Sequence, residues 1–433
     1  MQPGTRKMIG SKNDIEAELK SRILSPGNLK PSYSGYGIFN IPSTISNLLG
    51  SRTNTAPPLA RTIVNYDRSY STVILLLVDG LGWNLLKSSV QGSKNLAELA
   101  KAFPPSPITT VFPSTTSTVI TTLSTGKAPA EHGIVGYTMY VKQMGSIVSM
   151  LDFKNVSSTK DDNIFDKGIT PEEFLGVPTF YQALSKEGVQ SFVLTKNYLL
   201  GSGLSRITHT GAHQNGYVDV GDMFVLLRKL LESHRGLRKY IFVYWPSVDT
   251  ASHIFGPWSE ESAAEIRSLF FSLKEEFISK LTPELSRDTL MMITADHGQS
   301  YIPDEGVFDA SSDKELMDML VMPPTGDSRT VFLHVKEGLK GRVEEHLRKR
   351  FGEAFNCMDV DRIIEAGLLG PGEKKKGLRD SLGDTTIVMD AGKVIFYPFK
   401  IGSSYNQRGA HSGLTEDEIL VPYFGIPLSE LRL

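Results

Sequence analysis

Cysteine is almost absent from the sequence. Cys357 is the one cysteine among 433 residues, which excludes an internal disulfide and any metal site built from several thiolates. Such sparing use of cysteine is typical of proteins of the reducing cytoplasm. We therefore expect a cytoplasmic protein.

Long apolar segments are also missing. The longest runs, such as Val73–Val78, are far shorter than the roughly 20 residues that a membrane-spanning helix needs. The first residues do not combine positive charge, an apolar core and a cleavage site, as a secretory signal does. These absences predict a soluble protein that has no contact with a membrane.

An excess of one charge is the third absence. The sequence has 46 Lys and Arg against 48 Asp and Glu, so it offers no broad basic surface for a nucleic-acid polymer or an anionic membrane. Any charged partner must therefore be recognised by a local site.

Several apolar, β-branched segments are present and predict a central sheet. Each is too short for a buried helix and suits a strand that is covered on both faces, as in a parallel sheet. Amphipathic helical segments alternate with them, which favours an α/β fold whose mostly parallel central sheet is flanked by helices. The predicted strands are Thr72–Val78, Ser191–Thr195, Tyr240–Trp245 and Asp288–Thr294.

Composition divides the chain further. Residues 1–70 are rich in Ser, Gly, Asn and Pro, which predicts an N-terminal wrap on the core. Residues 71–433 form the predicted catalytic domain. Within it, 328–399 combines a strand, a charged helix and the lysine-rich loop around Lys374–Lys376, which predicts a small inserted α+β subdomain with a solvated loop.

Acidic residues and histidines follow the predicted strands. The carboxyl ends of parallel strands gather ligands at one edge of a sheet, so residues distant in sequence can meet there. Each spacing alone is common, and an Asp after a strand often only caps a helix. Together they predict a site for two divalent metal ions such as Zn²⁺, which binds carboxylate oxygen and imidazole nitrogen. The six candidate ligands are Asp79, Asp249, His253, Asp296, His297 and His411.

A nucleophile is predicted between the first two strands. Pro113 precedes a cluster of Ser and Thr and then an apolar run, which is typical of a helix N-terminus. Free backbone N–H groups and the helix dipole favour an anion such as phosphate there. A hydroxyl at this end could attack phosphorus or merely cap the helix. The spacing alone leaves Thr115, Thr116 and Ser117 as candidates.

The same segment resembles the type I phosphodiesterase and nucleotide pyrophosphatase family of the alkaline phosphatase superfamily. The family places a Thr nucleophile in F-P-x-x-T, followed by T-G and H-G-I at fixed distances, and this register selects Thr116. The resemblance extends from about Ser71 to the C-terminus. The matching residues are Phe112, Pro113, Thr116, Thr125, Gly126, His132, Gly133 and Ile134.

The resemblance implies an alkaline phosphatase-like fold and a covalent mechanism. One ion would be held by Asp249, His253 and His411, and the other by Asp79, Asp296, His297 and the Thr116 oxygen. Thr116 would form a phosphothreonine intermediate that water hydrolyses.

The implied substrate is a small phosphorylated molecule such as a nucleotide or phosphodiester. No arginine stands beside Thr116 to grip the extra charge of a monoester, which favours diesters. A phosphomonoesterase or phosphonate hydrolase on the same scaffold is the alternative enzyme. An inactive metal-binding relative is the alternative without catalysis.

Overall fold

The centre of the molecule is a seven-stranded sheet with the strand order β4-β20-β11-β3-β10-β8-β9. The computed structural model describes residues 12–53, 56–65, 67–158, 164–400 and 402–431. Strands from β11 to β9 run parallel, whereas β20 is antiparallel to both of its neighbours. The strands are β3 (Thr72–Val78), β4 (Ser106–Thr109), β8 (Gln190–Lys196), β9 (His213–Tyr217), β10 (Lys239–Trp245), β11 (Thr289–Thr294) and β20 (Leu420–Pro427).

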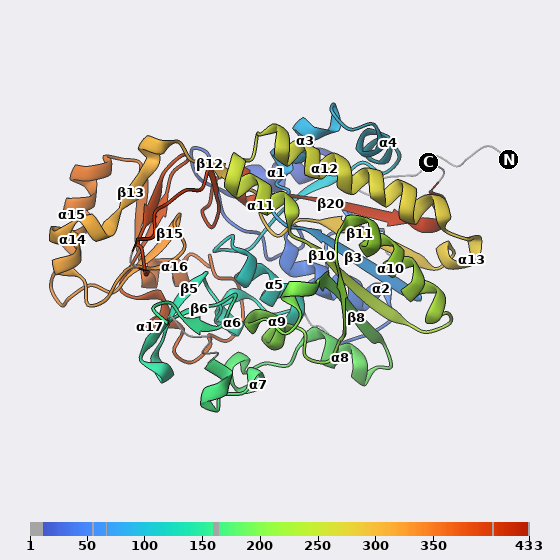
Figure 1. Ribbon diagram of the computed structural model, residues 1–433, viewed down its shortest axis with the longest axis horizontal. Helices are drawn as coiled ribbons and strands as arrows, with labels where there is room; N and C mark the ends of the chain where they lie inside the picture. The colour runs from blue at the N-terminus through green and yellow to red at the C-terminus, as the bar shows by residue number, and fades with distance from the viewer. Residues whose placement is uncertain (1–11, 54–55, 66, 159–163, 401, 432–433) are drawn as a thin grey trace.

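Helices cover both faces of this sheet (Figure 1). One layer contains α3 (Trp83–Val90), α4 (Lys94–Ala102), α10 (Val220–Ser233), α11 (Ser247–Phe255) and α12 (Glu260–Ser272), which continues into the π-helical turn η5 (Leu273–Phe277). The other layer contains α2 (Ile41–Leu48), α5 (Thr116–Thr125), α8 (Phe180–Lys186) and α9 (Gly203–Thr208). The arrangement confirms the predicted α/β fold with a mostly parallel central sheet.

The apolar composition of the central strands explains why they lie in the middle. Every residue of β3 and of β11 is buried, because helices cover both faces of these strands. Thr72 is in register with Lys239 at the start of β10, and Val78 with Trp245 at its end. The carboxyl ends of these strands therefore lie side by side.

A second seven-stranded sheet stands beside the first, in the order β16-β17-β15-β14-β5-β6-β7, with antiparallel neighbours. It joins two distant stretches of the chain, and Figure 1 shows β5 and β6 near β15. Its strands are β5 (Thr138–Val141), β6 (Ser146–Ser149), β7 (Lys154–Asn155), β14 (Thr325–Gly326), β15 (Thr330–Leu333), β16 (Phe355–Asp359) and β17 (Thr385–Met389).

This second sheet has a hydrophobic cluster of its own, to which Phe308, Leu347 and Ile387 contribute. The predicted subdomain 328–399 contains β15 to β17 but not β14 or β5 to β7, which complete the sheet. The helices around it are α14 (Lys314–Met319), α15 (Lys340–Phe351), α16 (Val360–Glu365) and α17 (Leu378–Leu382), and a separate parallel pair is formed by β13 (Val307–Asp309) and β18 (Val394–Phe396).

The described N-terminal residues pack on the main core, where Ile38, Ile41 and Ile45 are fully buried. The predicted division into a wrap at 1–70 and a catalytic domain at 71–433 stays a prediction. Within the described ranges, no helix is both long and apolar enough to span a bilayer. The remaining helices are α1 (Lys12–Ser21), α6 (Pro129–His132), α7 (Pro171–Leu175), α13 (Pro283–Ser286) and α18 (Glu416–Ile419).

Candidate active site

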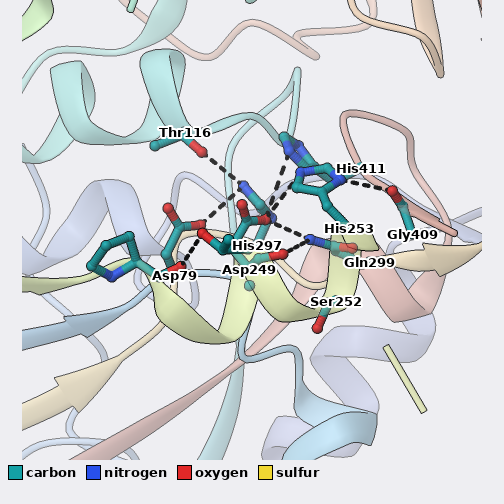
Figure 2. Close-up of polar contacts among 12 residues, drawn as sticks. Asp79, Thr116, Asp249, Ser252, His253, His297, Gln299, Gly409 and His411 are labelled. Atoms are coloured by element: carbon teal, nitrogen blue, oxygen red, sulfur yellow. Dashed lines mark hydrogen bonds and ion pairs between the residues drawn. The ribbon is translucent and has the colours of Figure 1, made fainter. Parts of the chain in front are cut away.

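The six candidate metal ligands lie together beyond the carboxyl ends of β3, β10 and β11. Figure 2 shows five of them converging near Thr116. They form two groups, and within each group the ligand atoms all lie within 4.8 Å of one another. The first group is Asp79, Asp296 and His297, and the second is Asp249, His253 and His411.

The strand order brings most of these residues together. Asp79 follows β3 and Asp296 follows β11, its parallel neighbour, while α11 begins just after β10 and carries Asp249. Gly80 has a φ of +76°, and a Cβ added there would lie 2.8 Å from the Cα of Asp249. A glycine is therefore required where the ends of β3 and β10 approach each other.

His411 reaches the site from the far end of the chain. The short strand β12 (Ser300–Tyr301) follows the loop of His297 and pairs antiparallel with β19 (Gly409–Ala410), directly before His411. The rings of His297 and His411 stack with centroids 3.7 Å apart. This small pairing fixes the late histidine against the end of the central sheet.

The first group is a buried cluster of unbalanced charge. His297 Nε2 lies 3.5 Å from Asp79 Oδ1 and 3.3 Å from Asp296 Oδ2. Within the described ranges, neither of these buried oxygens has a hydrogen-bond donor. Burial, followed by repulsion from Asp296 and Asp249, raises the pKa of Asp79 well above its ordinary value. Buried carboxylates so placed fit a cation between them.

The second group combines one carboxylate with two imidazoles. Asp249 and His253 are one turn apart on α11, with 3.4 Å between Asp249 Oδ1 and His253 Nε2, and His411 Nε2 lies 3.9 Å from the same oxygen. Burial and the neighbouring His297 and His253 lower the pKa of His411 well below its ordinary value. A neutral imidazole is the form that binds a metal.

Backbone carbonyls orient all three histidines. Nδ1 of His253 lies 2.7 Å from the carbonyl oxygen of Gly409, and Nδ1 of His411 lies 3.1 Å from that of Ser114. Nδ1 of His297 makes the same kind of contact with its neighbour Gly298 at 3.2 Å. Because a carbonyl only accepts, the proton belongs on Nδ1, and Nε2 of each ring is free to be a ligand.

Thr116 is the first residue of α5, and its hydroxyl faces the first group. Its Oγ1 lies 3.1 Å from Nε2 of His297. The neighbouring hydroxyls have other partners, because Thr115 Oγ1 donates to Asp327 and Ser117 Oγ donates to the carbonyl of Gly136. Of the three candidate nucleophiles, only Thr116 directs its hydroxyl to a candidate metal ligand.

A cavity of about 750 Å³ opens beside Thr116 and the second group. Its opposite wall comes from the second sheet and from residues 395–400 and 403–407. The half-buried aromatic residues Phe396, Tyr397 and Phe399 lie on this wall, together with Lys154 and the exposed Lys400. The cavity is large enough for a nucleotide-sized ligand.

Sequence reasoning missed three polar residues of the site. Gln299 Nε2 donates to Asp249 Oδ1, and the hydroxyl of Tyr244 donates to Asp79 Oδ2. Asp327 lies on the cavity wall beside Thr115. Gln299 could have been found from its place just after Asp296 and His297. No comparable motif marks Tyr244 inside an apolar strand or Asp327 in a distant hairpin.

The mostly parallel sheet gathers carboxylates and imidazoles at its strand ends, opposite a hydroxyl at a helix N-terminus, which is where α/β enzymes bind their ligands. Residues 73–414 match the family described as type I phosphodiesterase / nucleotide pyrophosphatase. The chain belongs to this family, whose members are phosphoric ester hydrolases. The resemblance noted from the sequence is confirmed.

Solved structures give the same fold. Murine ectonucleotide pyrophosphatase / phosphodiesterase 5 superposes with a TM-score of 0.60 at 18% identity, covering 81% of this chain and 87% of that protein. The human protein has a TM-score of 0.60 at 18% identity, covering 82% and 87%. Phosphonoacetate hydrolase from Sinorhizobium meliloti 1021 has a TM-score of 0.56 at 17% identity, covering 81% and 89%. The sequence matches no curated protein.

Proposed function

We propose that this protein is a metal-dependent phosphodiesterase or nucleotide pyrophosphatase with Thr116 as its nucleophile. The observation that carries the proposal is the convergence of two metal-ligand groups on one hydroxyl. The first group would hold one ion together with Thr116 Oγ1, and the second group would hold another. Imidazole and carboxylate donors gathered within 4.8 Å of one another in each group suit Zn²⁺.

The unpartnered oxygens of Asp79 and Asp296 support the binding of a cation. Two divalent ions would supply Lewis acidity, favouring the deprotonated form of the Thr116 hydroxyl and neutralising charge on the phosphoryl oxygens. Side chains and backbone groups of the protein would supply the nucleophile, stabilise the phosphoryl oxygens and orient the histidines.

Thr116 Oγ1 attacks phosphorus as the oxygen of one esterified group departs on the opposite side, which gives a phosphothreonine that still carries the second ester of the substrate. Water then cleaves the bond between Thr116 Oγ1 and phosphorus, which releases a phosphomonoester and restores the hydroxyl. The N-terminus of α5 aims its N–H groups at the same region, where they can stabilise a phosphoryl oxygen. The carbonyl contacts of His253, His297 and His411 keep Nε2 of each ring directed into the site.

The substrate proposed is a nucleotide or another small phosphodiester. An inactive form of murine ectonucleotide pyrophosphatase / phosphodiesterase 5 was solved in complex with AMP. The aromatic wall of the cavity suits a planar organic group of this kind. Use of Cys357 as the single cysteine favours a cytoplasmic setting.

Replacement of the nucleophile tests the proposal. Thr116→Ala should lower turnover of bis(p-nitrophenyl) phosphate by about a thousandfold or more while metal content, measured by elemental analysis, stays high. Thr116→Ser is the matched control, since it restores a hydroxyl and should recover part of the activity. Mass spectrometry of quenched reactions should find a p-nitrophenyl phosphoryl group on Thr116. Retained turnover in Thr116→Ala would exclude this nucleophile.

A substrate panel separates the alternatives. Rapid cleavage of p-nitrophenyl phosphate with an untouched diester would favour a phosphomonoesterase. Preference for a phosphonate would favour the second alternative, for which phosphonoacetate hydrolase provides a structural precedent. Tight metal binding without turnover of any of these would identify an inactive relative.

A further inference from the structure

Asp327 is a carboxylate beside the nucleophile that the mechanism above does not use. It lies in the tight connection between β14 and β15, where its backbone N–H donates to the carbonyl of Thr330 at 2.8 Å. Its side chain is held on two sides, because Oδ1 accepts from Thr115 Oγ1 at 3.1 Å and Oδ2 accepts from the N–H of Tyr137 at 3.0 Å. Asp327 and Thr116 line the same cavity.

The contact with Thr115 bears on how the site receives an anion. Thr115 is the N-cap residue of α5 and has extended backbone angles, but its side chain makes no capping hydrogen bond. Its hydroxyl donates to Asp327 instead. The first N–H groups of a helix have no acceptor within the helix. Because the Thr115 side chain bonds to Asp327, it does not cap the helix. The first backbone N–H groups of α5 are therefore available to a phosphoryl oxygen.

The charge of Asp327 bears on which anion the site prefers. Burial raises its pKa to about 6, so the carboxyl is ionised in an assay at pH 8. Among the described residues that line the cavity, no arginine is present, and the cationic side chains are Lys154 and Lys400. Near Thr116, a second negative charge on the phosphoryl group would thus meet a fixed carboxylate without an arginine to balance it.

We propose that Asp327 is a specificity-determining residue that makes this site select phosphoryl groups with one negative charge, as in a phosphodiester, over the dianion of a phosphomonoester. The inference rests on the proposed function, since it assumes that a phosphoryl group binds next to Thr116. Two anchors hold the carboxylate on the wall of the cavity, and it repels the additional charge of a monoester.

The charge-removing variant Asp327→Asn tests the inference at pH 8. The ratio of kcat/KM for p-nitrophenyl phosphate to that for bis(p-nitrophenyl) phosphate should rise by about tenfold, as expected for loss of a like charge several ångströms away. Asp327→Ser is a second charge-removing variant, which should shift the ratio in the same direction if Asp327→Asn does not fold. Asp318→Asn is the matched control, because Asp318 is 66% exposed, pairs with Lys314 and does not line the cavity.

Thr115→Val separates charge from hydrogen bonding. It removes the donated hydroxyl but keeps the carboxylate, so the monoester-to-diester ratio should stay within about twofold of the wild type. A ratio shifted as far in Thr115→Val as in Asp327→Asn would overturn the assignment to charge. An unchanged ratio in both charge-removing variants would overturn the inference altogether.

Binding of inorganic phosphate to the zinc-loaded protein gives a readout without turnover. At pH 8 phosphate is mainly a dianion, so calorimetry should show about tenfold tighter binding to Asp327→Asn than to the wild type. Equal affinities would contradict the inference even if the enzyme cleaves diesters. Conversely, a wild type that cleaves no ester would contradict the proposed function, while the phosphate titration would still decide the role of Asp327.

Discussion

The two walls of the cavity are built in different ways. One wall carries Thr116 and the second ligand group, at the edge where parallel strands of the central sheet end side by side. The first ligand group, Asp79, Asp296 and His297, is buried beside it, with His297 in contact with Thr116. The opposite wall belongs to the second sheet and to residues 395–400 and 403–407, and it gathers side chains from distant stretches of the chain. We expect the first wall to carry the proposed chemistry and the second wall to determine which substrate binds.

This comparison predicts that changes in the first wall abolish activity. Asp249→Ala should lower turnover by about a thousandfold and reduce the bound metal, because it removes the carboxylate that contacts both His253 and His411. Elemental analysis and kinetics check this together. His346→Ala is the matched control, since His346 pairs with Asp313 away from the cavity. Unchanged metal content and turnover in Asp249→Ala would remove the second group from the site.

The joint between the two walls should dominate stability. Arg329 and Glu418 form a fully buried ion pair, with Arg329 Nε 2.6 Å from Glu418 Oε1 and Nη2 2.8 Å from Oε2. Arg329 also donates to the carbonyls of Asp390 and Lys393, while Glu418 accepts from the N–H of Gly413, close to His411. The pair thus ties the second sheet to the loop of a metal ligand.

Glu418→Gln leaves the charge of Arg329 buried without its partner, so the free energy of unfolding should fall by about 3–5 kcal/mol. Chemical denaturation measures the loss. Asp361→Asn is the matched control, because the pair of Asp361 with Arg379 is more than half exposed and should contribute only about 0–1 kcal/mol. Equal losses of unfolding free energy in the two variants would mean that the buried ion pair contributes no more to stability than the exposed one.

The hydrogen bond that supports Asp79 from behind the first wall should have a smaller effect, which is on metal affinity. The hydroxyl of Tyr244, on β10, donates to Asp79 Oδ2, and Tyr244→Phe removes this bond without changing the packing. Loss of a partner behind a metal ligand typically weakens metal binding by about 10-fold to 100-fold, which a competition titration with a chelator would detect. Tyr240→Phe, on the same strand, removes a hydroxyl without touching the first group. Equal metal affinity in the two variants would refute a supporting role for Tyr244.

The same contrast explains what could be predicted from the sequence. Strand ends are marked by apolar runs, so the strand preceding Asp79 was predicted as Thr72–Val78 and is observed with the same bounds. The six candidate ligands were found because they follow predicted strands or belong to a family motif. The structure brings them together in two groups. Their roles as ligands and that of Thr116 as nucleophile stay predictions that the experiments above test.

Features that long-range contacts decide could not be predicted. The loop of Lys374–Lys376 was expected to be solvated, and Lys374 and Lys376 are exposed, but Lys375 is half-buried and its Nζ donates to the carbonyls of His132 and Leu175. This burial lowers its pKa to about 8. Asp327 also depends on a contact across the chain, with Thr115. No local pattern of residues encodes either partner.

The exact start of a helix is ambiguous in the sequence for a different reason. Asp219 and Asp222 both lie near the start of α10, where Asp219 is the N-cap and Asp222 stands in the first turn. Asp222 accepts from the N–H groups of Val218 and Asp219 and completes a capping box. Either acidic residue satisfies the composition of a helix start, and the backbone angles of the structure distinguish them.

The aromatic part of the second wall should give the smallest effect. Tyr397 and Phe399 lie with ring centroids 5.1 Å apart on the cavity wall, where they can contact a planar substrate group. Tyr397→Ala should raise KM for bis(p-nitrophenyl) phosphate by about fivefold and leave kcat within about twofold, because an aromatic contact of about 1 kcal/mol is lost equally from the ground and transition states. Phe271→Ala is the matched control, since Phe271 is a 58% exposed aromatic residue on α12. A fall in kcat with unchanged KM would instead place Tyr397 among the groups that stabilise the transition state. The second wall would then contribute to the chemistry as well as to substrate binding.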